Sequence, residues 1–220
     1  MKSLDIPLIG RLDIELPTDE ILNLLDTDGV RDAIDCVNWP GLFPYEPLTT
    51  FTAAHDGRNI YIDFFTRCNY LRAENFEPQS PVSQDSCVEF FVAPRDDGRY
   101  WNFEFNCIGT INASNRTDRP HPTRLSADEL SRIRVYPSCG KRPFCELEGL
   151  FSWNLLVIIP FDLIGVKFDG KPQTMRANFY KCASATAMPH YLSWNPIKTE
   201  RPDFHRPEFF GRITFNSAEG

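Results

Sequence analysis

Residues 87–107 read Cys-Val-Glu-Phe-Phe-Val-Ala-Pro-Arg-Asp-Asp-Gly-Arg-Tyr-Trp-Asn-Phe-Glu-Phe-Asn-Cys, and this stretch predicts a β-hairpin. Its two halves are rich in valine and aromatic residues, which favour strands. Pro94 and Asp97-Gly98 between them are turn signals. Because side chains on a strand alternate between its faces, Phe103 and Phe105 share one face and the intervening polar residues share the other. We therefore expect one face of the hairpin to lie in a core.

The rest of the chain repeats this pattern of short strands separated by turn residues. Residues 48–54 and 59–67 flank Asp56-Gly57, a second hairpin signal. Further strands are expected at 108–112, 151–159, 176–182 and 209–215, and short helices at 126–132 and 161–165. The sequence therefore predicts an all-β fold, an antiparallel β-sandwich with short peripheral helices. We expect one domain over residues 1–220, with 1–35 as an N-terminal lead and short helix packed on it.

Composition and charge exclude several classes of protein. The chain has 220 residues, of which 42% are hydrophobic and 24% charged, and this excludes disordered, collagen-like and coiled-coil proteins. Its net charge of −7 argues against nucleic acid as a partner, and its apolar runs are too short for membrane insertion. Met1 to Pro7 lack the pattern of a signal peptide, which slightly favours the cytoplasm. A secreted or periplasmic protein whose signal was removed is the alternative.

Seven cysteines are present, without a Cys-x-x-Cys motif. Cys87, Cys107 and Cys182 lie in apolar strand-like runs, so we expect buried, reduced thiols rather than a metal site. A link between Cys139 and Cys145 is the alternative in an oxidising compartment.

Polar side chains follow one face of three predicted strands. Glu89 lies on the first strand, Glu104 and Asn106 on the second, and Arg176 and Asn178 on another. If these strands are neighbours, one sheet face gathers the groups that hydrogen-bond to sugar hydroxyls. Two tryptophans in loop-like sequence, Trp39 and Trp194, are candidate platforms for the C–H face of a sugar.

Six motifs in order resemble family 9 carbohydrate-binding modules. Residues 84–92 match the "DS-VE-F" strand of that family, and residues 100–109 match the strand that follows it. The other matches are Trp153 to Phe161, Arg176 to Tyr180, Trp194 to Pro196 and Phe204 to Gly211. The resemblance implies a DOMON-like β-sandwich that binds sugar between aromatic side chains without catalysis. It also implies a small stand-alone bacterial branch with a role in polysaccharide catabolism, and structural Ca²⁺ in some members.

This sequence departs from that family at specific positions. The best-known binders carry a tryptophan six residues before the motif glutamate, and here that position is Ser83. The motif glutamate itself is kept as Glu89. The strand position at which those binders carry an arginine is Glu104, whereas the following asparagine is kept as Asn106. We expect a replacement for the missing aromatic wall to come from elsewhere, such as Trp39 or Tyr45.

Two other classes of function stay open as alternatives. A glycoside hydrolase would use Glu89 and Glu104 as its pair of carboxyl groups. A haem or redox DOMON domain would use Met175 or Met188 with His190 as axial ligands. For Ca²⁺, the oxygen-rich pairs Asp26-x-Asp28 and Asp96-Asp97 are candidate ligands.

Overall fold

The hairpin of residues 87–107 lies in the middle of the larger of two sheets in the computed structural model, which describes residues 1–217. Strand β6 (Cys87–Ala93) pairs antiparallel with β7 (Tyr100–Asn106), and Glu89 lies directly opposite Glu104. On its other side β6 pairs antiparallel with β12 (Gln173–Ala183). The three strands that carry the polar residues are therefore neighbours, which meets the condition for a shared polar face.

Six further strands complete the larger sheet. They are β1 (Ser3–Ile6), β3 (Cys36–Val37), β8 (Ile111–Arg116), β9 (Pro122–Arg124), β13 (His190–Ser193) and β14 (Gly211–Phe215). The main path runs β1-β14-β12-β6-β7-β8-β9, and β13 joins β12 to β3. Strand β1 is parallel to β14, and the other pairs are antiparallel.

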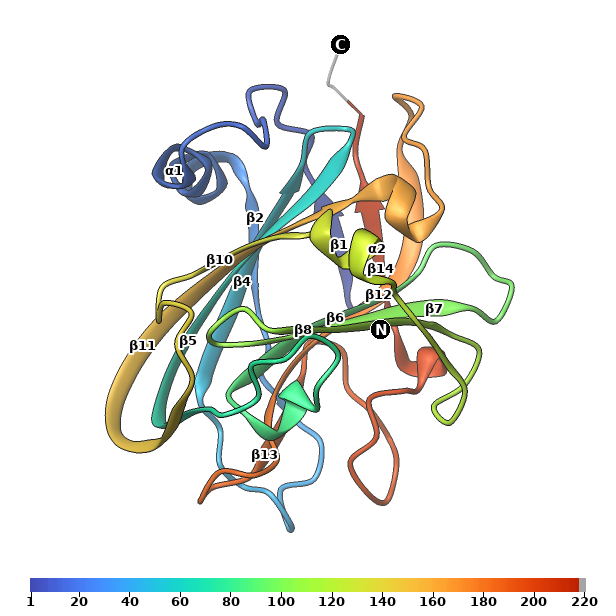
Figure 1. Ribbon diagram of the computed structural model, residues 1–220. Coiled ribbons are helices and arrows are strands. Elements are labelled where there is room, and N and C mark those ends of the chain that lie inside the picture. The colour runs from blue at the N-terminus through green and yellow to red at the C-terminus, as the bar shows by residue number, and fades with distance from the viewer. Residues whose placement is uncertain (218–220) are drawn as a thin grey trace.

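A second, five-stranded sheet packs against the first (Figure 1). Its order is β10-β11-β5-β4-β2, from β10 (Arg134–Pro137), β11 (Phe144–Pro160), β5 (Asn59–Ala73), β4 (Leu48–His55) and β2 (Val30–Ala33). The predicted Asp56-Gly57 turn joins β4 to β5, and Gly57 has a φ of 85°, which favours glycine.

Short helices cover the edges of the sandwich. Helix α1 (Thr18–Asp28) follows Pro17 and buries Leu24 and Leu25 on the outer face of the smaller sheet, at one side in Figure 1. The five-residue α2 (Ala127–Ser131) begins with a capping box formed by Ser126 and Glu129. Three 3₁₀ turns are also present: η1 (Val82–Gln84), η2 (Phe161–Ile164) and η3 (Pro207–Phe209).

Aromatic rings connect the two sheets across the core. Phe179 of β12 stacks on Phe51 of β4, with ring centroids 3.8 Å apart and an interplanar angle of 15°. Phe90 and Phe103 point into the same core from β6 and β7. Burial of side chains of this size contributes roughly 1.5–3 kcal/mol each relative to exposure, so this aromatic layer contributes to the stability of the sandwich.

The predicted fold class is confirmed, and the differences concern strand bounds and short strands. The strand expected at 108–112 is β8, at Ile111–Arg116, and the one expected at 209–215 begins at Gly211 as β14. Strands β1, β2, β3, β9, β10 and β13 have four residues or fewer and were not predicted. Strands this short show too few alternations to be recognised, and pairing with a longer neighbour holds them in place. Within residues 1–217, no helix is long and apolar enough to cross a bilayer.

Gly211 of β14 offers a test of how tightly this sheet packs. A Cβ atom at Gly211 would lie 3.0 Å from the Lys2 carbonyl oxygen and within contact of the Trp194 ring, whereas one at Gly10 would have no neighbour within 4 Å. We expect Gly211→Ala to lower the free energy of unfolding by about 1–3 kcal/mol, because an overpacked core must shift. Urea denaturation measures this, with Gly10→Ala as the control. Equal stabilities of the two variants would contradict the packing described.

Candidate functional site

A pocket of about 360 Å³ opens on the outer face of the larger sheet. This volume lies within the roughly 300–1,000 Å³ range of small-molecule sites. Three strands contribute its floor, with Glu89 from β6, Glu104 from β7 and Cys182 from β12. The other residues around it are Phe43, Ser83, Arg119, Ser184, Tyr191, Arg201, Pro202, Asp203, Phe204 and His205.

Strand alternation explains why two glutamates face this pocket. Phe90 and Phe103 point into the core from β6 and β7, so their neighbours Glu89 and Glu104 point outward. Residues directly opposite on an antiparallel pair have Cβ atoms about 4.5–5.5 Å apart. The floor of the pocket therefore carries two adjacent carboxyl groups.

Glu104 is held by two amides. Asn102 donates to its Oε1 at 3.0 Å, and Asn112 of β8 donates to its Oε2 at 2.9 Å. Burial raises the pKa of Glu104, while these two amides and Arg116 oppose that shift. Each oxygen has one protein donor, and a carboxylate oxygen can accept a further hydrogen bond.

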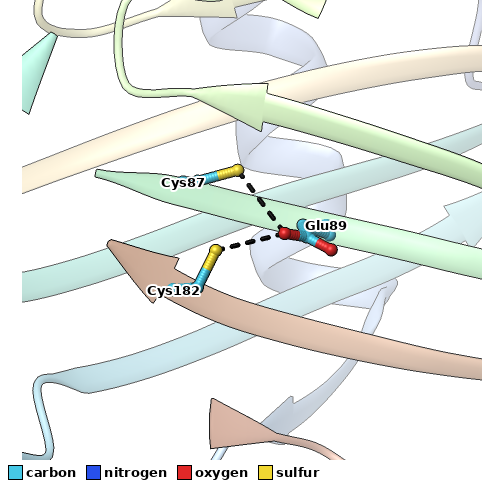
Figure 2. Close-up of side chains that lie close together, drawn as sticks. All are labelled: Cys87, Glu89 and Cys182. Atoms are coloured by element: carbon cyan, nitrogen blue, oxygen red, sulfur yellow. Dashed lines mark hydrogen bonds between the residues drawn. The ribbon is translucent and has the colours of Figure 1, made fainter. Parts of the chain in front are cut away.

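Two thiols reach one carboxyl oxygen of Glu89, as Figure 2 shows. Its Oε1 is 3.1 Å from Sγ of Cys182 and 3.8 Å from Sγ of Cys87, and both thiols donate to it. Burial raises the pKa of Glu89 well above its ordinary value, and the nearby Cys182 and Glu104 add to the shift. Glu89 and Glu104 are thus two carboxyl groups in different environments at one pocket.

Aromatic rings form one wall of the pocket. Phe43 and Tyr191 meet edge to face, with centroids 4.8 Å apart, and Phe204 lies 6.1 Å from Tyr191. Trp39, which the sequence predicted as a platform, is 5% exposed and lies behind this wall, 6.4 Å from both Tyr191 and Phe204. Its indole donates to the Thr199 carbonyl oxygen. Trp39 therefore supports the wall, and Phe43 and Tyr191 present their rings to the pocket.

Charged side chains complete the rim. Arg119 and Arg201 bring two guanidinium groups to it, and Arg119 pairs with Asp203 at 3.5 Å. Nδ1 of His205 is hydrogen-bonded to the Tyr100 hydroxyl at 3.0 Å. Burial lowers the pKa of His205 to about 3, and two nearby arginines contribute. His205 is therefore neutral at physiological pH.

The structure places the other four predicted site residues away from this pocket. Asn106 binds Asp85 and the Asn75 carbonyl oxygen. The Asn178 side chain donates to the Asn195 carbonyl oxygen and accepts from the backbone N–H groups of Asn195 and Phe179. Arg176 lies at a separate hollow and donates to the Phe210 carbonyl oxygen. Trp194 is fully buried between the sheets and donates to Asp32, so no face of its ring is open to a ligand.

The expectation of one open polar face is therefore corrected. Loop residues such as Ile197, Phe204 and Phe210 pack on Phe91 and Tyr180 of the sheet and form a second apolar core over most of its outer face. Polar side chains beneath this cover bond to the loop backbone, because a buried polar group without a partner is costly. The pocket lies where the cover ends, over Glu89 and Glu104.

Sequence reasoning missed Phe43, Tyr191, Arg119 and Arg201, which the structure brings to the pocket. Phe43 lies in a stretch rich in proline and aromatic residues, and this composition is the signal that could have drawn attention to it. Arg119 lies far in the sequence from Tyr191 and Arg201, and no local pattern brings the three together.

Residues considered for other chemistry have protein partners. His190 bonds through Nδ1 to the Met188 carbonyl oxygen and through Nε2 to Lys181, so neither ring nitrogen is free for haem iron. Asp26 pairs with Arg31 and Asp28 pairs with Arg11. The carboxylates of the Asp26-x-Asp28 candidate for Ca²⁺ thus already have cationic partners.

Comparison with known proteins agrees with the sandwich and its motifs. The family model of carbohydrate-binding family 9 matches residues 19–215, nearly the whole chain. The chain belongs to carbohydrate-binding family 9. No curated protein shows a significant match to the sequence.

Solved structures of family 9 modules share this fold. A candidate carbohydrate-binding protein from Bacteroides uniformis ATCC 8492 is 34% identical, with a TM-score of 0.91 over 98% of this chain and 99% of that one. A family 9 module from Caldicellulosiruptor kristjanssonii in complex with cellotriose is 13% identical, with a TM-score of 0.60 over 99% of this chain and 95% of that one. A family 9 module from the same organism in complex with glucose is 12% identical, with a TM-score of 0.59 over 99% of this chain and 97% of that one. These two complexes support the fold alone.

His205 predicts a specific loss of stability in acid. The unfolded chain protonates this residue below about pH 6.5, whereas the folded protein keeps it neutral down to about pH 3. The free energy of unfolding therefore falls as the pH drops between these values. In His205→Gln, urea denaturation from pH 7 to 4 should give a slope with pH that is smaller by up to ~1.4 kcal/mol per unit. The exposed His121→Gln is the control, and a slope unchanged in His205→Gln would contradict the assignment.

Proposed function

We propose that this protein binds a mono- or oligosaccharide non-catalytically in the pocket over Glu89 and Glu104. One observation carries the proposal: a floor with two carboxyl groups faces a wall with two aromatic rings, Phe43 and Tyr191. A sugar ring needs both surfaces, because its C–H face packs on aromatic rings while its hydroxyls need donors and acceptors.

The polar groups of the pocket suit hydroxyl recognition. Glu104 retains acceptor capacity beyond its two amide donors. Arg119 and Arg201 offer donors, and the raised pKa of Glu89 favours a carboxyl group that can also donate. A hydroxyl both donates and accepts, so these groups together satisfy it.

One position at which this sequence departs from the family also lies at this pocket. Ser83, where the resembling binders carry a tryptophan, lines it. Its small side chain leaves space that a tryptophan would fill, and Phe43 and Tyr191 provide the aromatic surface in its place. Family membership, the Bacteroides relative and the glucose and cellotriose complexes of the Caldicellulosiruptor module support a carbohydrate ligand here.

Calorimetric titration with glucose, xylose, galactose and cellotriose tests the proposal. We expect at least one of them to bind with a dissociation constant between about 1 µM and 1 mM, equivalent to about 4–8 kcal/mol. Phe43→Ala should weaken binding by about 2- to 10-fold, because an aromatic contact contributes about 0.5–1.5 kcal/mol. The exposed Phe76→Ala, which lies outside the pocket, is the control. Equal affinities of both variants, or no binding by a broad glycan array, would contradict this site.

A second candidate function is glycoside hydrolysis. The observation in its favour is that Glu89 and Glu104 lie opposite each other, one beside two thiols with a raised pKa and the other held by two amides. A retaining glycosidase uses an acid and a nucleophile with this contrast, about 5–5.5 Å apart.

Hydrolysis of aryl glycosides distinguishes the two functions. A binding protein leaves these substrates intact, and this is the result we expect. Release of the phenol that Glu89→Gln and Glu104→Gln each abolish, with Glu74→Gln as an exposed control, would instead establish an enzyme.

A further inference from the structure

Two cysteines and a glutamate form a cluster beneath the pocket floor. Cys87 of β6 and Cys182 of β12 are direct partners across the two strands, and Glu89 lies two residues further along β6 on the same face. Figure 2 shows the two sulfur atoms directed toward the same oxygen of the carboxyl group. One ligand atom from each residue lies within 4.8 Å of the other two. Among the described residues, this is the one group of three or more potential metal ligands.

We propose that Cys87, Cys182 and Glu89 bind one thiophilic divalent cation, of which Zn²⁺ is the prototype. Bond lengths of about 2.3 Å to sulfur and 2.0–2.2 Å to oxygen separate a sulfur and an oxygen around one tetrahedral zinc by about 3.6 Å. The two sulfur–oxygen distances here, 3.1 and 3.8 Å, bracket that value. The ligands therefore need only small shifts to surround an ion.

Charge compensation favours a cation at this place. Glu89 is only 2% exposed, so little water reaches its carboxyl group. In the described part of the chain, no lysine or arginine forms an ion pair with it. An isolated buried carboxylate is costly, whereas one that coordinates a metal is compensated. On binding, both thiols and the Glu89 carboxyl group release their protons to solvent, and the two sulfur atoms and one carboxylate oxygen coordinate the ion. Arg119 and Arg201 line the same pocket and favour the negative charge that remains.

The cluster is closed on one side and open on the other. Cys87 is fully buried, and Glu89 and Cys182, which are 2% and 1% exposed, line the bottom of the pocket. Three protein ligands with an open fourth position are typical of zinc sites that take water or a ligand. Thiolates select Zn²⁺ or Cd²⁺ over Ca²⁺ and Mg²⁺, which prefer oxygen ligands. This site does not depend on the proposed sugar function.

Co²⁺ is a spectroscopic probe for this site. The full chain is reduced with a phosphine, stripped with a chelator, and titrated with Co²⁺ under nitrogen. We expect a thiolate-to-cobalt charge-transfer band in the near ultraviolet that saturates at one equivalent. One equivalent of Zn²⁺ should remove the band, and excess Ca²⁺ should not.

Variants assign the band to its ligands. Changes even outside the ligand set lower metal affinity 10- to 100-fold, so Cys87→Ser and Cys182→Ser should each weaken Co²⁺ binding by more than about tenfold. Cys145→Ser replaces an exposed thiol and is the matched control. Glu89→Gln leaves both thiols in place and should weaken binding too, so a folding defect of one serine variant does not decide the outcome.

Two results would overturn the proposal. One is the absence of a charge-transfer band in protein whose seven cysteines have all been shown to be reduced by a thiol assay. The other is a band that persists in Cys87→Ser and Cys182→Ser, which would assign the metal to other cysteines. Failure of sugar binding would leave these spectra unchanged, so the two proposals are tested separately.

Discussion

The alternation of side chains along three neighbouring strands is the constraint on which the rest of the structure depends. On β6, β7 and β12, every second residue enters the core, where Phe90, Phe103 and Phe179 pack toward the smaller sheet. The contact between Phe179 and Phe51 fixes the register of this arrangement. A slip of one residue would turn the phenylalanines to the outside and the glutamates into the core. The position of the pocket floor is therefore a consequence of core packing.

The outer face of the larger sheet is unusual because a second apolar core covers most of it. Tyr180 stacks on Phe204 at 4.2 Å, and Phe91 and Tyr100 pack against the same loop region. This cover ends over Glu89 and Glu104, and the pocket lies at that place. The aromatic wall is part of the cover, so the loops that close the face also shape the pocket.

The chemistry of the pocket floor comes from its burial. A carboxyl group with two thiols as neighbours is poorly solvated, and its pKa rises for that reason. While it holds its proton, such a carboxyl group can hydrogen-bond to a sugar hydroxyl or act as a general acid. It can also exchange that proton for a metal cation. Glu89 therefore belongs both to the proposed sugar site and to the proposed metal site.

The sequence by itself determined the fold class, the central hairpin, the order of its motifs and the face on which each strand residue lies. These features depend on local periodicity and turn signals, which one chain displays without its partners. It also pointed to Glu89 and Glu104, because both follow from strand parity. Only the tertiary structure decided that Trp194 lies in the core and that Asn106 and Asn178 hydrogen-bond to backbone groups. It also decided that Phe43 and Tyr191 form the aromatic wall of the pocket. Those outcomes, and the meeting of Cys87 with Cys182, depend on which distant segments pack together, and long-range packing leaves no local pattern in the sequence.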